Sequence, residues 1–92
     1  MVKLILASPI AVATGGTREI DVDFEGTLKG LFDLVASRYG TQFYARVLQD
    51  DGALRRFVNA YVNGEDVRFL AGLETRIPRD ATVDLLPAVS GG

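Results

Sequence analysis

The sequence of 92 residues contains no cysteine and no histidine. These absences exclude a disulfide framework, an iron–sulfur cluster and a zinc site built from cysteine and histidine. They also exclude a cysteine nucleophile and a histidine general base. We expect a cytoplasmic location, with which the lack of thiols is compatible.

Long apolar runs and clusters of basic residues are missing as well. No run approaches the roughly 20 apolar residues of a membrane-spanning helix, and basic residues are scattered through a chain with a formal charge of −2. We therefore expect neither a membrane nor a nucleic acid as partner. The first residues are not expected to form a signal peptide, because Pro9 interrupts them and residues 2–6 alternate like a strand. With 48% hydrophobic residues, the chain can fold as one small domain.

Alternation of apolar and polar residues predicts several strands. Within residues 17–24, Ile20, Val22 and Phe24 fall on one face and acidic residues on the other. Asn63–Gly64 between two β-rich runs predicts a hairpin turn, because both residues tolerate positive φ. The predicted strands cover residues 2–7, 17–24, 54–62, 65–69 and 82–87, with a short edge segment at 72–77.

One amphipathic helix is predicted in the first half of the chain. Thr27 is suited to its N-cap, and Gly40 stands where a helix commonly ends. Between them, apolar residues recur at helical spacing: Leu28, Leu31, Phe32, Val35 and Tyr39. Residues 8–16 are predicted to be a loop, and residues 41–48 are ambiguous between a loop and a short helical turn.

The order of these elements predicts an α+β fold. One amphipathic helix has one sheet to cover, so a two-layer arrangement is the economical solution. A helix laid across a mixed sheet of four to five strands, with the last strand in the centre, is a β-grasp or ubiquitin-like fold. We expect this domain to comprise residues 1–88 and to be followed by a flexible C-terminal diglycine tail, residues 89–92.

Inside this domain no motif predicts a conventional active site. Gly15–Thr17 is not a phosphate-binding loop, because no Gly-Lys-Ser/Thr follows and the next element is a strand. Asp50–Asp51 precedes a glycine in a turn, where solvated carboxylates are common. Arg55–Arg56 is interpreted as a solvated strand edge. We expect no catalytic residue and no metal ligand in the chain.

The end of the chain is where the sequence offers a reactive group. The residues after Pro87 are small or medium in size and uncharged apart from the terminal carboxylate. Extended, Val89–Gly92 would project about 13 Å, and Gly91–Gly92 could pass through a slot too narrow for other residues. A carboxylate is a poor electrophile until ATP activates it as an acyl-adenylate. Attack by sulfide would then give a thiocarboxylate, and attack by an amine would give an amide, although an incidental glycine-rich end also fits these residues.

Two stretches resemble the ThiS/MoaD family of ubiquitin-like sulfur carriers, and within it the CysO-type carriers of thiocarboxylate-dependent cysteine biosynthesis. They are "VNGEDV" (Val62–Val67) and "LPAVSGG" (Leu86–Gly92). The resemblance is specific over residues 57–92 and looser before them. The turn at residues 78–81, "PRDA", departs from the Asp-Gly-Asp-like turn common in the family, a difference expected to alter the shape of the loop only.

This resemblance implies a β-grasp fold and a carrier or co-substrate rather than an enzyme. It implies that Gly92 is the site of adenylate and thiocarboxylate attachment, and that Val89, Ser90 and Gly91 thread a partner's active site. The implied partners are an E1-like adenylating enzyme, of a kind that can carry zinc, and a sulfur-accepting synthase. The carrier itself binds no cofactor, and ATP is used by the activating enzyme. Cysteine synthesis is favoured; molybdopterin, thiamin and tRNA thiolation, a protein modifier acting through Gly92, and a plain interaction module stay open.

The strand pattern also predicts a docking surface. Asp84, Asn59 and Lys3 mark the solvent face of three strands, so Leu86, Phe57, Tyr61 and Ile5 share that face with them. We expect these four apolar residues to gather into an exposed patch beside the tail, where a partner could dock. A register shifted by one residue would bury them instead.

Overall fold

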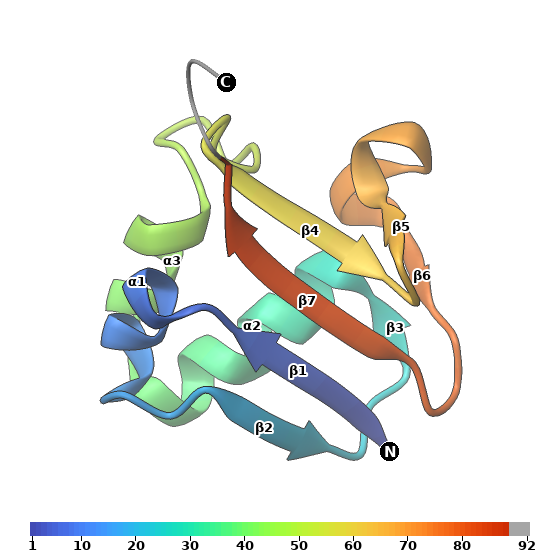
Figure 1. Ribbon diagram of the computed structural model, residues 1–92, viewed down its shortest axis with the longest axis horizontal. Helices are drawn as coiled ribbons and strands as arrows, with labels where there is room; N and C mark the ends of the chain where they lie inside the picture. Colours follow the sequence, from blue (N-terminus) through green and yellow to red (C-terminus); the bar gives the residue numbers. More distant parts are fainter. Residues whose placement is uncertain (89–92) are drawn as a thin grey trace.

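The computed structural model describes residues 1–88 and is built on a mixed sheet of five strands (Figure 1). The spatial order is β2-β1-β7-β4-β5, in which β1 and β7 are parallel and the other pairs antiparallel. The strands are β1 (Val2–Leu6), β2 (Glu19–Val22), β4 (Val58–Val62), β5 (Glu65–Asp66) and β7 (Thr82–Pro87). The last strand is central, as predicted, and the α+β β-grasp architecture is confirmed.

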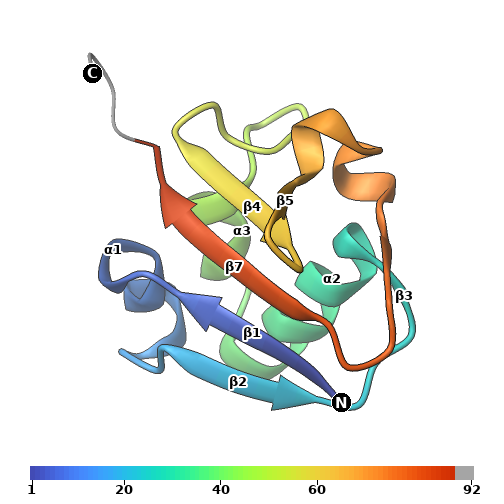
Figure 2. The ribbon, with the colours of Figure 1, turned by 45° about the vertical axis from the view of Figure 1, so that its right-hand side comes forward.

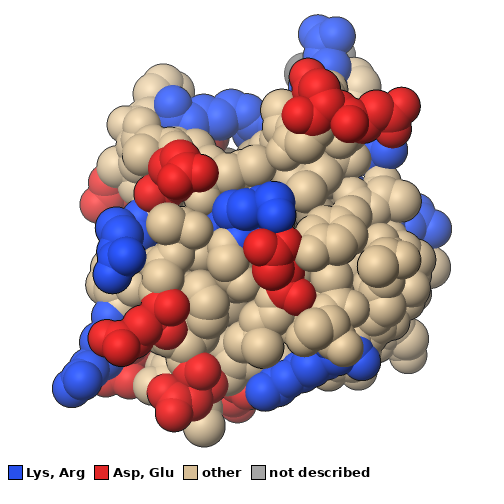
Figure 3. Space-filling model, turned by 180° about the vertical axis from the view of Figure 1, so that it is seen from behind, with Lys and Arg blue, Asp and Glu red and all other residues tan. Residues whose placement is uncertain are grey.

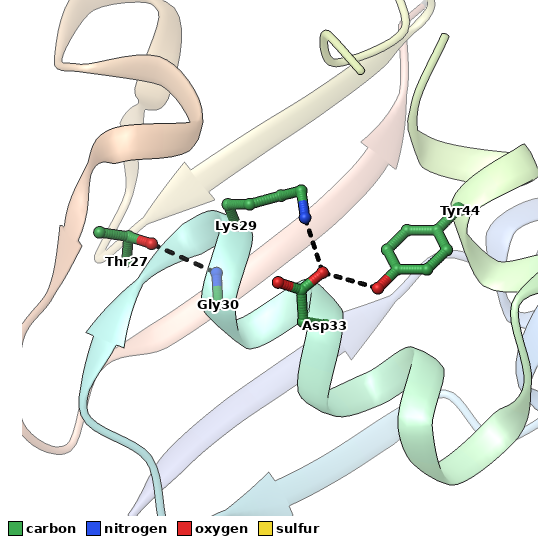
Figure 4. Close-up of polar contacts among 5 residues, drawn as sticks. All are labelled: Thr27, Lys29, Gly30, Asp33 and Tyr44. Atoms are coloured by element: carbon green, nitrogen blue, oxygen red, sulfur yellow. Dashed lines mark hydrogen bonds and ion pairs between the residues drawn. The ribbon is translucent and has the colours of Figure 1, made fainter. Parts of the chain in front are cut away.

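The main helix, α2 (Leu28–Tyr39), lies across one face of the sheet (Figures 1 and 2). Its predicted cap is present, since Thr27 Oγ1 accepts a hydrogen bond of 3.2 Å from the Gly30 amide (Figure 4). Glycine is unusual inside a helix, and packing explains its presence at position 30. A Cβ on it would lie 3.1 Å from the ring of Phe24, tighter than ordinary van der Waals contact.

The core lies between α2 and the sheet. Phe32 of α2 meets Phe43 edge to face, with ring centroids 5.5 Å apart and planes at 74°. Both rings are fully buried. Phe43 belongs to α3 (Gln42–Val47), which resolves the ambiguous segment as a helix. Burial of Phe43 and Val47 in the core, where Phe43 packs on α2, explains why this short segment is helical.

The predicted loop at residues 8–16 is wrong, because most of it is helical. It contains α1 (Ser8–Ala11) and a 3₁₀ turn, η1 (Val12–Thr14). Pro9 occupies the first turn of α1, where its missing amide costs no hydrogen bond. Ile10 of α1 is buried, and the Thr14 hydroxyl donates to carbonyls on both sides of the turn. The proline that suggested a loop therefore begins a helix.

The strand predicted from residue 54 begins at Val58 instead. Leu54 forms only an isolated bridge with Leu48, and the chain between them turns around the carboxylate of Asp51. That carboxylate accepts hydrogen bonds from the Ala53 amide and the Gln49 side chain. These hydrogen bonds lower the pKa of Asp51, the Ala53 amide having the larger effect.

The Asn63–Gly64 hairpin is confirmed, with φ of 49° and 85° at its two residues. The strand predicted to continue to residue 69 ends at Asp66, whose side chain accepts a hydrogen bond from the Arg68 amide and caps the 3₁₀ turn η2 (Val67–Phe69). Val67 is fully buried by this turn. The edge segment at 72–77 is a 3₁₀ turn, η3 (Gly72–Glu74), and β6 (Arg76–Ile77), which pairs with β3 (Gly26–Thr27) in a second small sheet. β2 also stops at Val22, short of the predicted residue 24.

Candidate functional site

Strand β7 carries the chain to the end of the sheet where Ala88 is the last described residue. Backbone hydrogen bonds hold it on both sides: Ala7 N donates to Leu85 O at 3.0 Å, and Ala88 N donates to Phe57 O at 2.7 Å. Because β1 and β7 are parallel, Ala88 lies at the end of the sheet opposite Met1 (Figure 2). The fold thus fixes the position from which residues 89–92 continue.

Three of the four residues predicted to form a docking patch, Ile5, Tyr61 and Leu86, lie in strands on the face of the sheet not covered by α2. Leu86 is 40% exposed, whereas Ile5 and Tyr61 are partly buried. Residues of opposite parity, such as Leu85, are fully buried, so the predicted faces agree with the structure at these three positions. Phe57, predicted as a strand residue, lies in the turn just before β4 and is 56% exposed beside the end of β7. The docking role of all four stays a prediction.

Strand register shows how closely these side chains approach. Ile5, Asp84 and Tyr61 form one cross-strand row, and Leu86 pairs with Asn59 in the next row toward the chain end. Directly paired residues have Cβ atoms about 4.5–5.5 Å apart. A carboxylate therefore separates Ile5 from Tyr61. The most apolar part of the face is the part formed by Phe57 and Leu86, next to the end of β7.

Charged side chains occupy the other half of the same face. Lys3 of β1 approaches Glu19 of β2, with Nζ and Oε1 3.0 Å apart. The hydrogen bond to Glu19 raises the pKa of Lys3, and the charges of Glu19 and Asp21 act in the same direction. Both partners are well exposed, so the pair adds little stability. The open face is therefore apolar near Ala88 and mixed in charge near Met1.

A pocket of about 360 Å³ adjoins the end of β7. Its lining includes the apolar residues Ile10, Val58 and Pro87 and three exposed arginines: Arg46, Arg55 and Arg56. Arg55 and Arg56 are exposed to solvent, as predicted, but they precede β4 instead of forming its edge, and they also line this pocket. Sequence reasoning missed it because Arg46 and Ile10 belong to helices that it did not assign.

The helix-bearing side of the molecule carries interleaved acidic and basic side chains (Figure 3). On α2, Asp33 accepts hydrogen bonds from Lys29 Nζ at 2.7 Å and from the Tyr44 hydroxyl at 2.6 Å, which links α2 to α3 (Figure 4). The Lys29 bond, followed by the Tyr44 bond, lowers the pKa of Asp33, and the bonds to Asp33 raise those of Lys29 and Tyr44. The side chains of Lys29 and Asp33 are well exposed, so this ion pair adds little stability.

Within residues 1–88 no cluster of acidic side chains has the arrangement of a metal site. No helix in that part of the chain is long and apolar enough to cross a membrane. Val89, Ser90, Gly91 and Gly92, the residues predicted to enter a partner and to carry the cargo, lie outside the described residues.

The five-stranded mixed sheet with a central last strand, covered by α2, defines a ubiquitin-like β-grasp protein. The chain belongs to the ThiS family, whose model matches residues 4–92. Over 79 residues it is 40% identical to the sulfur carrier protein CysO of Mycobacterium tuberculosis, covering 86% of this chain and 85% of that protein.

Solved structures agree with this assignment. The crystal structure of M. tuberculosis CysO, described as an antigen, superposes with a TM-score of 0.87 at 34% identity over 97% of this chain and 100% of that one. CysO in the Amycolatopsis orientalis BexX/CysO complex gives a TM-score of 0.86 at 36% identity over the whole of both chains. The small archaeal modifier protein 1 of Methanosarcina acetivorans gives 0.78 at 27% identity over 99% of this chain and 95% of that one. The protein is a ubiquitin-like protein of the sulfur-carrier class, and such proteins serve as carriers or substrates of enzymes.

Proposed function

We propose that the carboxyl group of Gly92 carries sulfur in this protein. Attack of the carboxylate on the α-phosphorus of ATP, in the active site of an E1-like enzyme, expels pyrophosphate and leaves an acyl-adenylate. Hydrosulfide then attacks the acyl carbon and expels AMP, leaving a thiocarboxylate that a synthase uses. The chain supplies no acid, base or metal to these steps, and ATP is bound by the partner.

The observation that carries this proposal is the family match, which extends through residue 92. The geometry supports it, since the central strand ends in a backbone held from both sides, Ala7–Leu85 and Ala88–Phe57. Because this part of the backbone is already held in the free protein, a partner that binds beside it has no entropic cost to meet for ordering it. The identity to CysO favours cysteine synthesis as the destination of the sulfur, in the cytoplasm.

We propose further that Phe57, Leu86, Tyr61 and Ile5 form the docking surface, with Phe57 and Leu86 contributing most. These two are the most exposed of the four and lie nearest the end of β7. Apolar side chains at the centre of an interface, enclosed by polar neighbours, commonly supply most of the binding energy. Asn59 and Asp84 are those polar neighbours here.

The test is reconstitution with ATP, sulfide and an E1-like enzyme, followed by intact-mass measurement. We expect the mass change of one oxygen replaced by one sulfur. A variant with one alanine added after Gly92 should gain no sulfur, and Arg79→Ala, in the turn at the opposite end of the sheet, should behave like the wild type. Sulfur on the extended variant, in the absence of a protease, would refute the proposal.

A protein modifier is the second candidate function. The likeness to small archaeal modifier protein 1 favours it. In this case an amine attacks the same adenylate and Gly92 becomes amide-linked to another protein. Covalent adducts bearing Gly92 on lysines of other proteins, recovered from native cells, would support modification, whereas free thiocarboxylate would support the carrier.

A further inference from the structure

We propose that the pocket bounded by Arg46, Arg56 and Pro87 is a second docking point, which receives an acidic segment of a partner enzyme bearing an apolar side chain. This inference rests on the proposed function, because it concerns how partners hold the protein while Gly92 reacts. The pocket measures about 360 Å³, the size of a site for one or two side chains.

The charge of the pocket indicates what kind of partner segment it would bind. Its titratable lining residues are all arginines, at positions 46, 55 and 56. Within the part of the chain that the structure describes, no ion pair involves any of them, since the three pairs found are Met1–Asp80, Lys3–Glu19 and Lys29–Asp33. Two acids, Asp50 and Asp51, lie in the same loop, and neither forms an ion pair with these arginines. The Asp51 carboxylate accepts hydrogen bonds from the Ala53 amide and the Gln49 side chain instead. Three guanidinium groups with no carboxylate partner among residues 1–88 suit an acidic segment.

The arginines are held by the fold to different degrees. Arg55 Nε donates a 2.8 Å hydrogen bond to the Ala45 carbonyl, so this residue also supports the loop. Arg56 lies over the ring of Phe57, with its guanidinium carbon 5.5 Å from the ring centroid. Arg46 is exposed in the last turn of α3. Arg46 and Arg56 are therefore the residues whose charge can be changed with least effect on folding.

The apolar lining of the pocket and its position beside the docking patch also favour this occupant. Pro9, Ile10, Val58 and Pro87 are apolar lining residues of the pocket, which suits an aliphatic or aromatic side chain better than a free inorganic anion. Phe57 belongs both to this pocket and to the predicted docking patch. A partner covering the patch would therefore reach the pocket without a break. The two surfaces flank the end of β7, so engaging both would fix the direction from which the chain end enters the partner.

The first experiment measures adenylation by ATP–pyrophosphate exchange with an E1-like enzyme that accepts the wild-type protein. We expect the double variant Arg46→Glu/Arg56→Glu to raise the KM for the carrier about tenfold with kcat unchanged, and to weaken the dependence of KM on salt. Arg79→Glu makes the same change of charge per residue near Met1 and should leave KM unaltered. An unchanged KM in the double variant would overturn the pocket proposal alone, whereas no exchange with the wild type would overturn the proposed function.

The second experiment needs no enzyme. Amide chemical shifts of the whole protein are followed while a short peptide alternating glutamate with leucine is added, against control peptides alternating lysine with leucine and glutamate with serine. We expect shifts at residues 46, 49 and 56–58 with the first peptide only. Equal shifts with either control would refute the need for both charge and an apolar group. If deletion of residues 89–92 strengthened binding of the peptide, the chain's own end would be the occupant, and the partner segment would be excluded.

Discussion

Leu85 and Leu86 are the same residue type at adjacent positions of β7, yet they face opposite sides of the sheet. Leu85 is fully buried and Leu86 is 40% exposed. Leu85→Ala removes buried methyl groups and leaves a cavity, which costs about 2–5 kcal/mol. Leu86→Ala loses only part of the transfer energy of a leucine and opens to solvent, so we expect about 1 kcal/mol.

These costs translate into different thermal behaviour. For a domain of this size each kcal/mol lowers Tm by about 4–8 °C. Leu85→Ala should therefore lower Tm by about 8–40 °C and Leu86→Ala by less than about 10 °C, measured by circular dichroism. The two variants should rank in the opposite order for binding to an E1-like enzyme, measured at a temperature where both are folded. Leu86→Ala should weaken binding about tenfold, and Leu85→Ala should leave binding nearly unchanged. Equal losses of stability, or unaltered binding in Leu86→Ala, would refute the assignment of the exposed face to docking.

Three further expectations concern single positions. Tyr61→Asp should lower stability as well as binding, because it adds a carboxylate beside Asp84 in one cross-strand row. Tyr61→Ser should weaken binding while keeping the Tm within a few degrees of the wild-type value. Unfolding of Tyr61→Ser would contradict this expectation. Thr27→Ala should cost about 1 kcal/mol in denaturant unfolding, because it removes the cap of α2, whereas Thr27→Ser should retain most of that stability. Asp33→Asn should cost about 0.3–0.5 kcal/mol at neutral pH, because it weakens the contact with Lys29. Folding lowers the pKa of Asp33 from its ordinary value of 3.8, so the contribution of this carboxylate to stability is fully present above that value and is lost as the pH falls below it. If the difference in stability between wild type and Asp33→Asn persisted at the lowest pH, this explanation would be excluded.

The parts of the fold that sequence reasoning found are those with a local signal. Thr27 and Gly40 bracket α2 because capping depends on nearby residues. The Asn63–Gly64 turn and the alternation in β7 are equally local. The central position of β7 followed from the order of the elements, because one helix and four or five strands leave few ways to build two layers.

The parts of the fold that sequence reasoning missed depend on contacts between residues that are distant in sequence. α1 is only four residues long, too short for helical spacing to be recognised, and it is stabilised by burial of Ile10. The end of β5 is set by the Asp66 side chain capping η2, which competes with extension of the strand. The arginine pocket joins α1, α3 and the end of β4, so none of its parts carries a signal alone.

The register of β7 links the core to the proposed chemistry. A shift of this strand by one residue would replace Leu85 by Leu86 in the core at little cost, but it would also expose Val83 and turn the carboxylate of Asp84 inward, and these two costs fix the register. The same register places Ala88, whose amide donates the last backbone hydrogen bond in the described part of the chain, to Phe57 O at 2.7 Å. In the proposed function the carboxyl group of Gly92 reacts, and Ala88 is the fixed point from which the remaining residues continue toward it. The packing energy of the core, acting through the register of β7, therefore sets the position from which Gly92 would be presented to a partner.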